Sequence, residues 1–305
     1  MLAFTLRRLV VAIFVGFTVS LVAFALLRLS GDLAAAIAGP EATAEQVEAI
    51  RQDFGLNQPI VMQYLDWLWG AVRFDFGNSF FFRSTVADMI ADRMPVTLLL
   101  GGLSIAFALI LAIPLGVIAA VKQNTWIDRT ALSIAVAGQA MPSFWFALIL
   151  IIVFSVNLRW LPVSGSETWA HFVLPSIALG YYATPSIMRL TRTGMLDVLQ
   201  SDYIRTARAK GLRPAKVLFK HALRNAVIPV VALAAVQFGF MLGGSIIIET
   251  IFSLQGLGHL MWESISRKDF PVVQAVLLLI ALFYVLLTFV ADLLNAWLDP
   301  RMRVS

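Results

Sequence analysis

Six long apolar runs constrain the fold of this chain more than any other feature of its sequence. None of them contains a charged residue, and they cover residues 9–27, 96–121, 130–156, 172–188, 226–248 and 271–291. A helix of about 20 apolar residues crosses the roughly 30 Å hydrocarbon layer of a bilayer. Because the runs are continuous and do not alternate between apolar and polar residues, they predict membrane-spanning helices and not the strands of a barrel.

The composition agrees with a membrane protein. The chain is 60% hydrophobic and 13% charged, whereas soluble domains carry about 25% charged residues. We therefore expect an all-α polytopic membrane protein with six transmembrane helices. The fourth run is the weakest of the six, because it has only 17 residues and contains Pro175 and Pro185. The absence of cysteine excludes disulfides and thiol chemistry.

The distribution of Lys and Arg predicts the orientation. Arg7 and Arg8 precede the first run as in a signal peptide, but the run is longer than a usual signal core, so we expect it to be retained as the first span. With a cytosolic N-terminus, fifteen of the 23 Lys and Arg residues lie on the cytosolic side, as the positive-inside rule requires. Both termini are then cytosolic, and the segment 29–95 is extracytosolic.

A basic segment at 202–224, between the fourth and fifth runs, carries seven Lys or Arg residues. Each cation at the centre of a membrane helix costs about 2.5–3.5 kcal/mol, so residues 189–225 are expected to form a cytosolic connection. Asp202 is a candidate cap for a helix over 203–210, Gly211 suits a left-handed helix end, and Pro214 suits the first turn of a second helix. A solvated loop and a docking element for another protein both remain open from this pattern alone.

The extracytosolic segment is expected to contain two helices and an aromatic loop. Thr43 and Gln46 form a capping-box pattern before a helix that carries Val47 and Ile50. A second helix, rich in Tyr and Trp, is expected at the membrane interface. The loop DFGNSFFFRS (75–84) either packs on the spans or contacts a partner.

Several segments resemble the permeases of ABC importers, specifically the dipeptide, oligopeptide and nickel branch. The matching pieces occur in the right order along nearly the whole chain: ATAEQVEAIRQDFGLNQPI (42–60), DFGNS (75–79), MPSFW (141–145), WLPVSG (160–165), LPSIALG (174–180), SDYIRTARAKG (201–211), KHALRNAVIPVV (220–231), LGGSIIIETIFSLQGLG (242–258), DFPVVQ (269–274) and LLNAWLDPR (293–301). Arg205 stands where the general importer loop has Glu, and the run from Gly211 to Pro229 is longer, as in the peptide branch.

The resemblance implies a type I ABC importer fold with three parts: an N-terminus and first span (1–28), a helical extracytosolic insert (29–93) and a permease core (94–303). It also implies a homologous second permease, two cytosolic ATPases that bind ATP and Mg²⁺, and an extracytosolic solute-binding protein, in a bacterial inner membrane. Residues 201–217 would be the coupling helix, which sits in a groove on the ATPase. The candidate coupling residues are Asp202, Tyr203, Arg205, Thr206, Ala207, Arg208, Ala209, Lys210, Gly211 and Pro214. Ala207 and Gly211 match the small residues of the importer loop.

The sequence offers no enzyme site and no metal site. It has no GxxxxGK[ST] motif, so we expect no ATP hydrolysis by this chain and no cofactor bound to it. The predicted spans contain no ionisable group, which argues against an ion-coupled secondary transporter, the alternative function class. Import of nickel is less expected than import of peptides, because His and carboxylates do not cluster. The stretch AAIAGPEA (35–42) favours short-peptide or glutathione-like substrates within the family.

Four polar residues are candidates for the substrate path. Gln139, Ser143 and Gln237 lie within the runs, where they either join helices by hydrogen bonds or line a wet path. Glu249 follows the fifth run and is either a solvated span end or a group at the outer mouth that meets a peptide's ammonium. For contact with the binding protein, the candidates are Phe76, Gly77, Asn78, Phe80 and Phe81.

Overall fold

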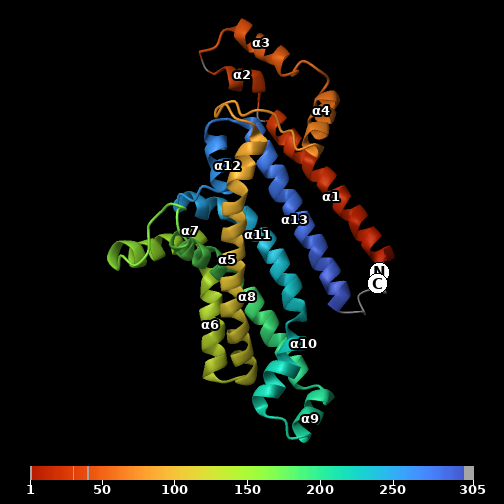
Figure 1. The fold of residues 1–305 in the computed structure, drawn as a ribbon, viewed down its shortest axis with the longest axis vertical. Coiled ribbons are helices and arrows are strands. Elements are labelled where there is room, and N and C mark those ends of the chain that lie inside the picture. The colour runs from red at the N-terminus through yellow and green to blue at the C-terminus, as the bar shows by residue number, and fades with distance from the viewer. Residues whose placement is uncertain (1, 30, 40, 299–305) are drawn as a thin grey trace.

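Long helices form the body of the protein. The computed structural model describes residues 2–29, 31–39 and 41–298. The long helices are α1 (Leu2–Leu29), α5 (Val86–Val121), α8 (Ala170–Leu199), α11 (Ile228–Ile251) and α13 (Phe270–Leu298). Shorter elements are α2 (Leu33–Ala38), α3 (Ala44–Asp53), α4 (Ile60–Val72), α6 (Trp126–Ala140), α7 (Ser143–Leu150), π-helical η1 (Ile151–Asn157), α9 (Asp202–Ala209), π-helical η2 (Lys216–Leu223), α10 (Arg224–Ala226) and α12 (Leu257–Ser266). The insert α2–α4 lies at one end of the body, and α9 lies at the opposite end (Figure 1).

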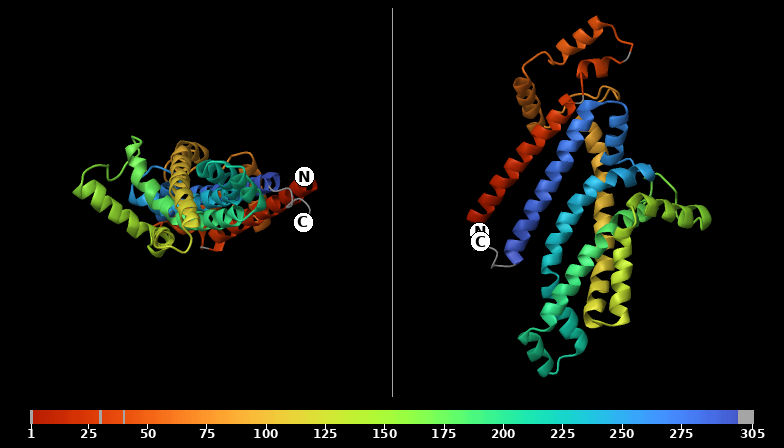
Figure 2. Two further views of the ribbon diagram at one scale, coloured as in Figure 1. Left: turned by 90° about the horizontal axis from the view of Figure 1, so that it is seen from below. Right: turned by 180° about the vertical axis from the view of Figure 1, so that it is seen from behind.

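Helices α5 and α8 pack closely along the middle of the body (Figures 1 and 2). A Cβ on Gly116 of α5 would lie 2.7 Å from Cβ of Thr191, and a Cβ on Gly180 of α8 would overlap the carbonyl oxygen of Ser104. Small residues allow membrane helices to approach in this way. The largest apolar core surrounds this contact and includes Leu100 and Ile187, both fully buried.

The helices agree with most of the predicted spans. Four stretches are long and apolar enough to cross a membrane: Thr5–Ala25, Val86–Val121, Ile228–Ile251 and Phe270–Leu294. Helix α5 begins ten residues before the predicted start of its span, because Thr85 caps it by accepting a hydrogen bond from the Asp88 N–H at 3.2 Å. Helix α8 covers the fourth predicted span. The count of six passes stays a prediction.

The third predicted span, 130–156, is not one helix. Met141 is extended at φ −107° and ψ 137°, and this residue separates α6 from α7. The cause is Pro142, because proline disfavours the helical conformation of the residue before it. Helix α6 returns along α5, and α7 then turns away from the body (Figure 1).

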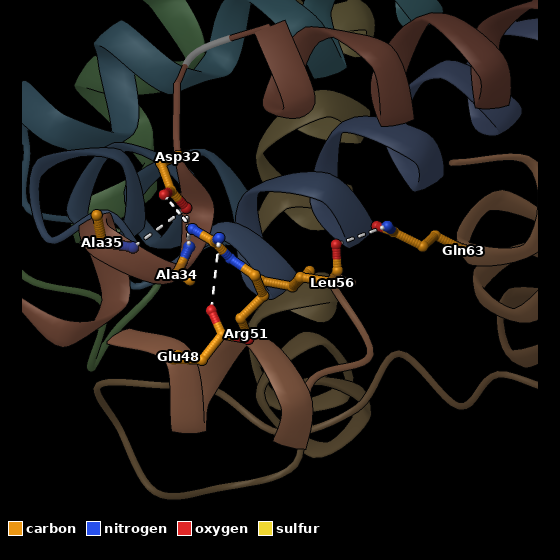
Figure 3. Close-up of polar contacts among 7 residues, drawn as sticks. All are labelled: Asp32, Ala34, Ala35, Glu48, Arg51, Leu56 and Gln63. Carbon is orange, nitrogen blue, oxygen red and sulfur yellow. Dashed lines mark hydrogen bonds and ion pairs between the residues drawn. The ribbon is translucent and has the colours of Figure 1, made fainter. Parts of the chain in front are cut away.

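The insert is ordered by its own polar contacts and by its packing on α1. The predicted capping box is present, with the Thr43 N–H donating to Gln46 Oε1 at 2.9 Å. Helix α2 was not predicted from the sequence; Asp32 caps it and also binds Arg51 of α3 (Figure 3). Figure 3 also shows Gln63 of α4 donating to the Leu56 carbonyl, at 3.1 Å.

Tyr64 holds α4 against the first helix. Its ring meets the rings of Phe17 and Phe24 edge-on, with centroids 6.1 and 5.3 Å away, and its hydroxyl is 2.8 Å from Ser20 Oγ. Aromatic pairs of this geometry are favourable beyond the area that they bury. The predicted aromatic helix therefore lies on α1.

The two ends of the chain that the structure describes lie side by side. Arg8 Nη1 of α1 is 2.9 Å from Asp292 Oδ2 of α13. The N-terminal end of α1 and the C-terminal end of α13 therefore both lie away from the insert (Figure 2), which fits the expectation that both termini are on one side. Arg301, Arg303 and the end of the predicted core at 303 lie outside the described residues.

A buried ion pair joins α6 to α8 at the end of the body opposite the insert. Arg192 donates from Nε to Asp128 Oδ1 at 2.8 Å and from Nη2 to Oδ2 at 2.7 Å. Asp128 is only 3% exposed. The hydrogen bonds from Arg192 hold the pKa of the Asp128 carboxyl below its ordinary value of 3.8. Because the folded protein lowers this pKa, the pair stabilises the fold above that ordinary value, and its contribution is lost as the pH falls through the lowered pKa.

We predict that Asp128→Asn lowers the free energy of unfolding by about 3 kcal/mol at neutral pH, because it leaves Arg192 partly buried without its carboxylate. The measurement is thermal unfolding of the purified assembled protein in detergent. The difference from the unchanged protein should shrink in acid, where Asp128 is protonated. Asp197→Asn, at an exposed position of α8, is the matched control and should leave stability unchanged. Equal stability of Asp128→Asn and Asp197→Asn at neutral pH would contradict the prediction.

Candidate functional site

A polar cavity of about 530 Å³ lies between α6, α7, α8 and α11. Its polar lining residues are Gln139, Ser143, Tyr182, Ser186 and Gln237. The other lining residues are Gly244 and apolar residues such as Met241 and Ile247. Three of the four residues predicted for a substrate path therefore share one cavity.

The break at Met141–Pro142 brings two of these residues to the cavity. Gln139 lies near the end of α6, and Ser143 is the first residue of α7. In a continuous helix the two side chains would be neighbours on one face. Here the chain turns between them, and both line the cavity from separate helices.

Tyr182 and Ser186 were not predicted from the sequence. They are four residues apart on α8 and so share a face of that helix. Ser186 Oγ accepts a hydrogen bond from Gln139 Nε2 at 3.3 Å. The spacing of four residues between them could have indicated a polar face on this helix. The fourth run contains two prolines and was the weakest predicted span, so no such face was expected there.

Glu249 lies outside the cavity and is fully buried. Thr97 Oγ1 of α5 donates to Glu249 Oε1 at 2.8 Å, and the backbone N–H of His259 donates to Glu249 Oε2 at 3.0 Å. The Leu257 N–H donates to Thr97 Oγ1, also at 2.8 Å. The sequence interpretation placed Glu249 at an exposed span end or at the outer mouth. Instead, its carboxyl group holds the first turn of α12 against α5 and α11.

Glycines make room for this carboxyl group. A Cβ on Gly256 would lie 2.6 Å from Thr97 Oγ1 and also 2.6 Å from Cδ of Glu249, and a Cβ on Gly258 would lie 3.0 Å from Glu249 Oε2. Buried polar groups need partners, and here the free N–H groups at the start of a helix supply them. We call Glu249, Thr97 and the start of α12 the outer junction. Helix α12 was not predicted from the sequence.

The basic segment forms two short helical elements with a turn at Gly211. Gly211 has φ +74°, in the left-handed region, as predicted. Helix α9 begins at Asp202, and its N-cap residue is Ser201 rather than Asp202. Pro214 starts the next helical turn, which continues as η2. The Asn225 amide donates to the Tyr203 hydroxyl at 2.8 Å and so ties α9 to α10.

This elbow, residues 201–226, is docked on the body by its apolar face. Ile204, Ala207, Val217 and Ala222 are buried with Val117 and Met195 at the ends of α5 and α8. Ala207 was expected to contact a partner, but its side chain faces the body of the protein instead. The apolar residue Ile204, three positions earlier on the same helix face, could have indicated this burial. The other nine predicted coupling residues are exposed: Asp202, Tyr203, Arg205, Thr206, Arg208, Ala209, Lys210, Gly211 and Pro214.

The aromatic loop at 75–84 is folded against α12 and α13. Asp269, which is fully buried, accepts a hydrogen bond from the Phe80 N–H at 3.2 Å and another from the Ser79 hydroxyl. Arg267 lies over the Phe81 ring, 3.9 Å from its centroid. Among the predicted docking residues, Phe76 and Phe80 are half-buried, whereas Gly77, Asn78 and Phe81 are exposed.

Comparison with known proteins gives two family matches. Residues 112–304 match the family described as binding-protein-dependent transport system inner membrane component, and residues 1–101 match the N-terminal region of the same kind of protein. The chain is 45% identical over 304 residues to glutathione transport system permease proteins GsiC of Escherichia coli strain K12 and of Shigella dysenteriae serotype 1, covering 99% of both chains.

Solved structures give a matching fold. An inward-facing conformation of the MetNI methionine ABC transporter aligns with a TM-score of 0.58 and 20% sequence identity, covering 69% of this chain and 96% of the other. At this identity the likeness shows the fold alone. The fold expected from the sequence, an all-α type I ABC importer permease, is confirmed.

We predict that Glu249→Leu lowers the free energy of unfolding by about 3 kcal/mol or more, because it leaves the Thr97 hydroxyl and the His259 N–H buried without an acceptor. Gly256→Ala should have an effect in the same direction, because its Cβ would displace the carboxyl group. Thermal unfolding of the assembled protein in detergent measures both. Glu263→Gln, which removes a surface ion pair on α12, is the control and should cost less than about 1 kcal/mol. If Glu249→Leu were as mild as this control, the outer junction would not be holding α12.

Proposed function

Because the chain belongs to the family of binding-protein-dependent transport system inner membrane components, we propose that it forms half of the translocation path of an ATP-driven importer of small peptides. Glutathione is the first substrate to test, since the relatives at 45% identity are named for its transport. The observation that carries this proposal is that one helix, α8, connects the cavity to the elbow. Tyr182 and Ser186 of this helix line the polar cavity, and its last residue, Leu199, leads directly into the exposed basic elbow.

The cavity suits a path for peptides. Gln139 and Gln237 offer both donors and acceptors, and Tyr182, Ser143 and Ser186 offer hydroxyl groups. Peptide backbones present the complementary groups. The cavity is open on one side in this chain, where Tyr182 and Phe240 are 55% and 61% exposed. A homologous second permease would close it and supply the other half of the path.

Of the two cytosolic ATPase subunits of the importer, one would have a groove on its surface that binds the elbow of this chain. Its buried face fixes the elbow to α5 and α8, so a push on its outer face is transmitted to the helices that line the cavity. The cations on the outer face keep the elbow out of lipid. ATP and Mg²⁺ would bind to the partner subunits, and nucleotide would favour one of two arrangements of the permease pair.

An extracytosolic binding protein would deliver the substrate at the end that carries the insert. The exposed residues Gly77, Asn78 and Phe81 offer a docking surface there, held in place by Asp269. This arrangement puts both termini in the cytosol of a bacterium, on the inner face of its inner membrane. Reconstitution with the second permease, the ATPases and the binding protein, followed by measurement of glutathione and dipeptide uptake, tests the whole proposal.

We predict that Gly211→Trp abolishes co-purification of the ATPase subunits or lowers substrate-stimulated ATPase activity by about tenfold or more, a loss of at least 1.4 kcal/mol. A Cβ at this position meets nothing within 4 Å in the chain, so the indole would project into the space proposed for the ATPase. Gly211→Ala is the matched control, because it carries the same backbone strain of about 1 kcal/mol without the bulk. A fully coupled Gly211→Trp importer would refute the assignment of the elbow.

We predict that Gln139→Leu lowers substrate uptake by about fivefold to tenfold without changing assembly, because one side-chain hydrogen bond is worth about 1 kcal/mol. Uptake into proteoliposomes and size-exclusion chromatography measure the two properties. Gln123→Leu, in the exposed turn between α5 and α6, should leave both unchanged. Normal uptake by Gln139→Leu would remove this residue from the path.

A further inference from the structure

Arg189 extends the polar face of α8 beyond the cavity. Tyr182, Ser186 and Arg189 are separated by four and three residues, so they lie in a row on one side of the helix. Arg189 Nη2 donates to Gln139 Oε1 at 3.4 Å, and the same amide of Gln139 donates to Ser186. Helix α8 runs toward the elbow (Figure 1). Arg189 follows Tyr182 and Ser186 along this helix, so it is the residue of the row that is nearest to the elbow.

The charge of Arg189 is not compensated by a neighbouring carboxylate. Within the described part of the chain, no Asp or Glu oxygen lies within ion-pair distance of its guanidinium. Arg192, one turn further along α8, is instead paired with Asp128. The 3.4 Å bond to Gln139 is long for an N–H···O hydrogen bond. Arg189 is therefore free to exchange this weak bond for a stronger one.

Among the described residues that line the cavity, none is Asp or Glu. Glu249, the carboxylate that the sequence suggested for the path, is enclosed in the outer junction. The charged side chain that contacts the lining residue Gln139 is that of Arg189, which is positive. This differs from one of the two sequence interpretations of Glu249, in which this residue meets the ammonium group of a peptide; the other was a solvated span end.

We propose that Arg189 receives the carboxylate of the substrate as it moves from the cavity toward the elbow, and so makes this permease selective for peptides with a free carboxylate. This inference rests on the proposed function. The planar guanidinium matches a carboxylate through two parallel hydrogen bonds. Gln139, released from Arg189, then has its amide oxygen available for a peptide N–H group.

The test compares a tripeptide that has a free C-terminal carboxylate with its C-terminal amide. The complete importer is reconstituted in liposomes with its binding protein, and ATP-driven uptake of both peptides is measured after the affinity of the binding protein for each has been determined. The variants are Arg189→Gln and Arg189→Lys. Arg129→Gln is the control, since Arg129 is an exposed cation at the start of α6 and does not line the cavity.

We expect the unchanged importer to favour the free carboxylate by about tenfold or more, after correction for binding-protein affinity, because a hydrogen bond to a charged group contributes this much. Arg189→Gln should reduce the preference to about twofold or less by slowing uptake of the free acid alone, Arg189→Lys should keep part of it, and Arg129→Gln should keep all of it. The ratio of the two uptake rates separates this role from a merely structural one.

Two results would overturn the inference while leaving the proposed function intact. One is that Arg189→Gln slows both peptides equally, as expected if the side chain only anchors α8 at the membrane surface. The other is an unchanged preference in Arg189→Gln. An unchanged importer that assembles with its partners but carries neither peptide would instead overturn the proposed function and the inference together.

Discussion

The close approach of α8 to α5 is the contact on which the other features depend. Gly116 and Gly180 let the two helices approach closely at two separate points, so α8 is held along much of its length. From this fixed position α8 presents Ser186 to the cavity at one level and Arg192 to Asp128 at the next. It then ends at the elbow. A single well-packed helix thus connects the polar cavity to the exposed face of the elbow, which we propose as the contact with an ATPase subunit.

The elbow has two faces with different tasks. Ile204 and Val217 are buried against α5 and α8, whereas the basic side chains of α9 point to the outside. Apolar packing makes the elbow part of the body, and positive charge keeps its outer face in water. The same division explains why Ala207, a small residue in a basic motif, belongs to the inner face.

Much of the fold could be predicted because it follows from local patterns. The length of the runs without charged residues predicted the positions of α1, α5, α11 and α13. The left-handed φ of Gly211 was predictable because the chain needs a turn there. The burial of Glu249 could not be predicted, because its partner Thr97 is 152 residues away in the sequence. The cavity was partly predictable: Gln139 and Gln237 were evident as polar residues in apolar runs. Pro142, inside the third run, was the overlooked signal for the turn that places Ser143 beside them.

The attachment of the insert has a consequence for how such a chain can diversify. Helix α4 is held on α1 by Tyr64, and the polar contacts of Arg51 and Asp32 lie within the insert itself. Helix α3 contributes no buried residue. Helices α2–α4 thus form a small unit that is attached to the body through α1 and through the contact of Phe54 with Phe80 of the aromatic loop, with ring centroids 4.9 Å apart. Substitutions on the exposed surface of α2–α4 can therefore accumulate without disturbing the packing of the long helices against one another.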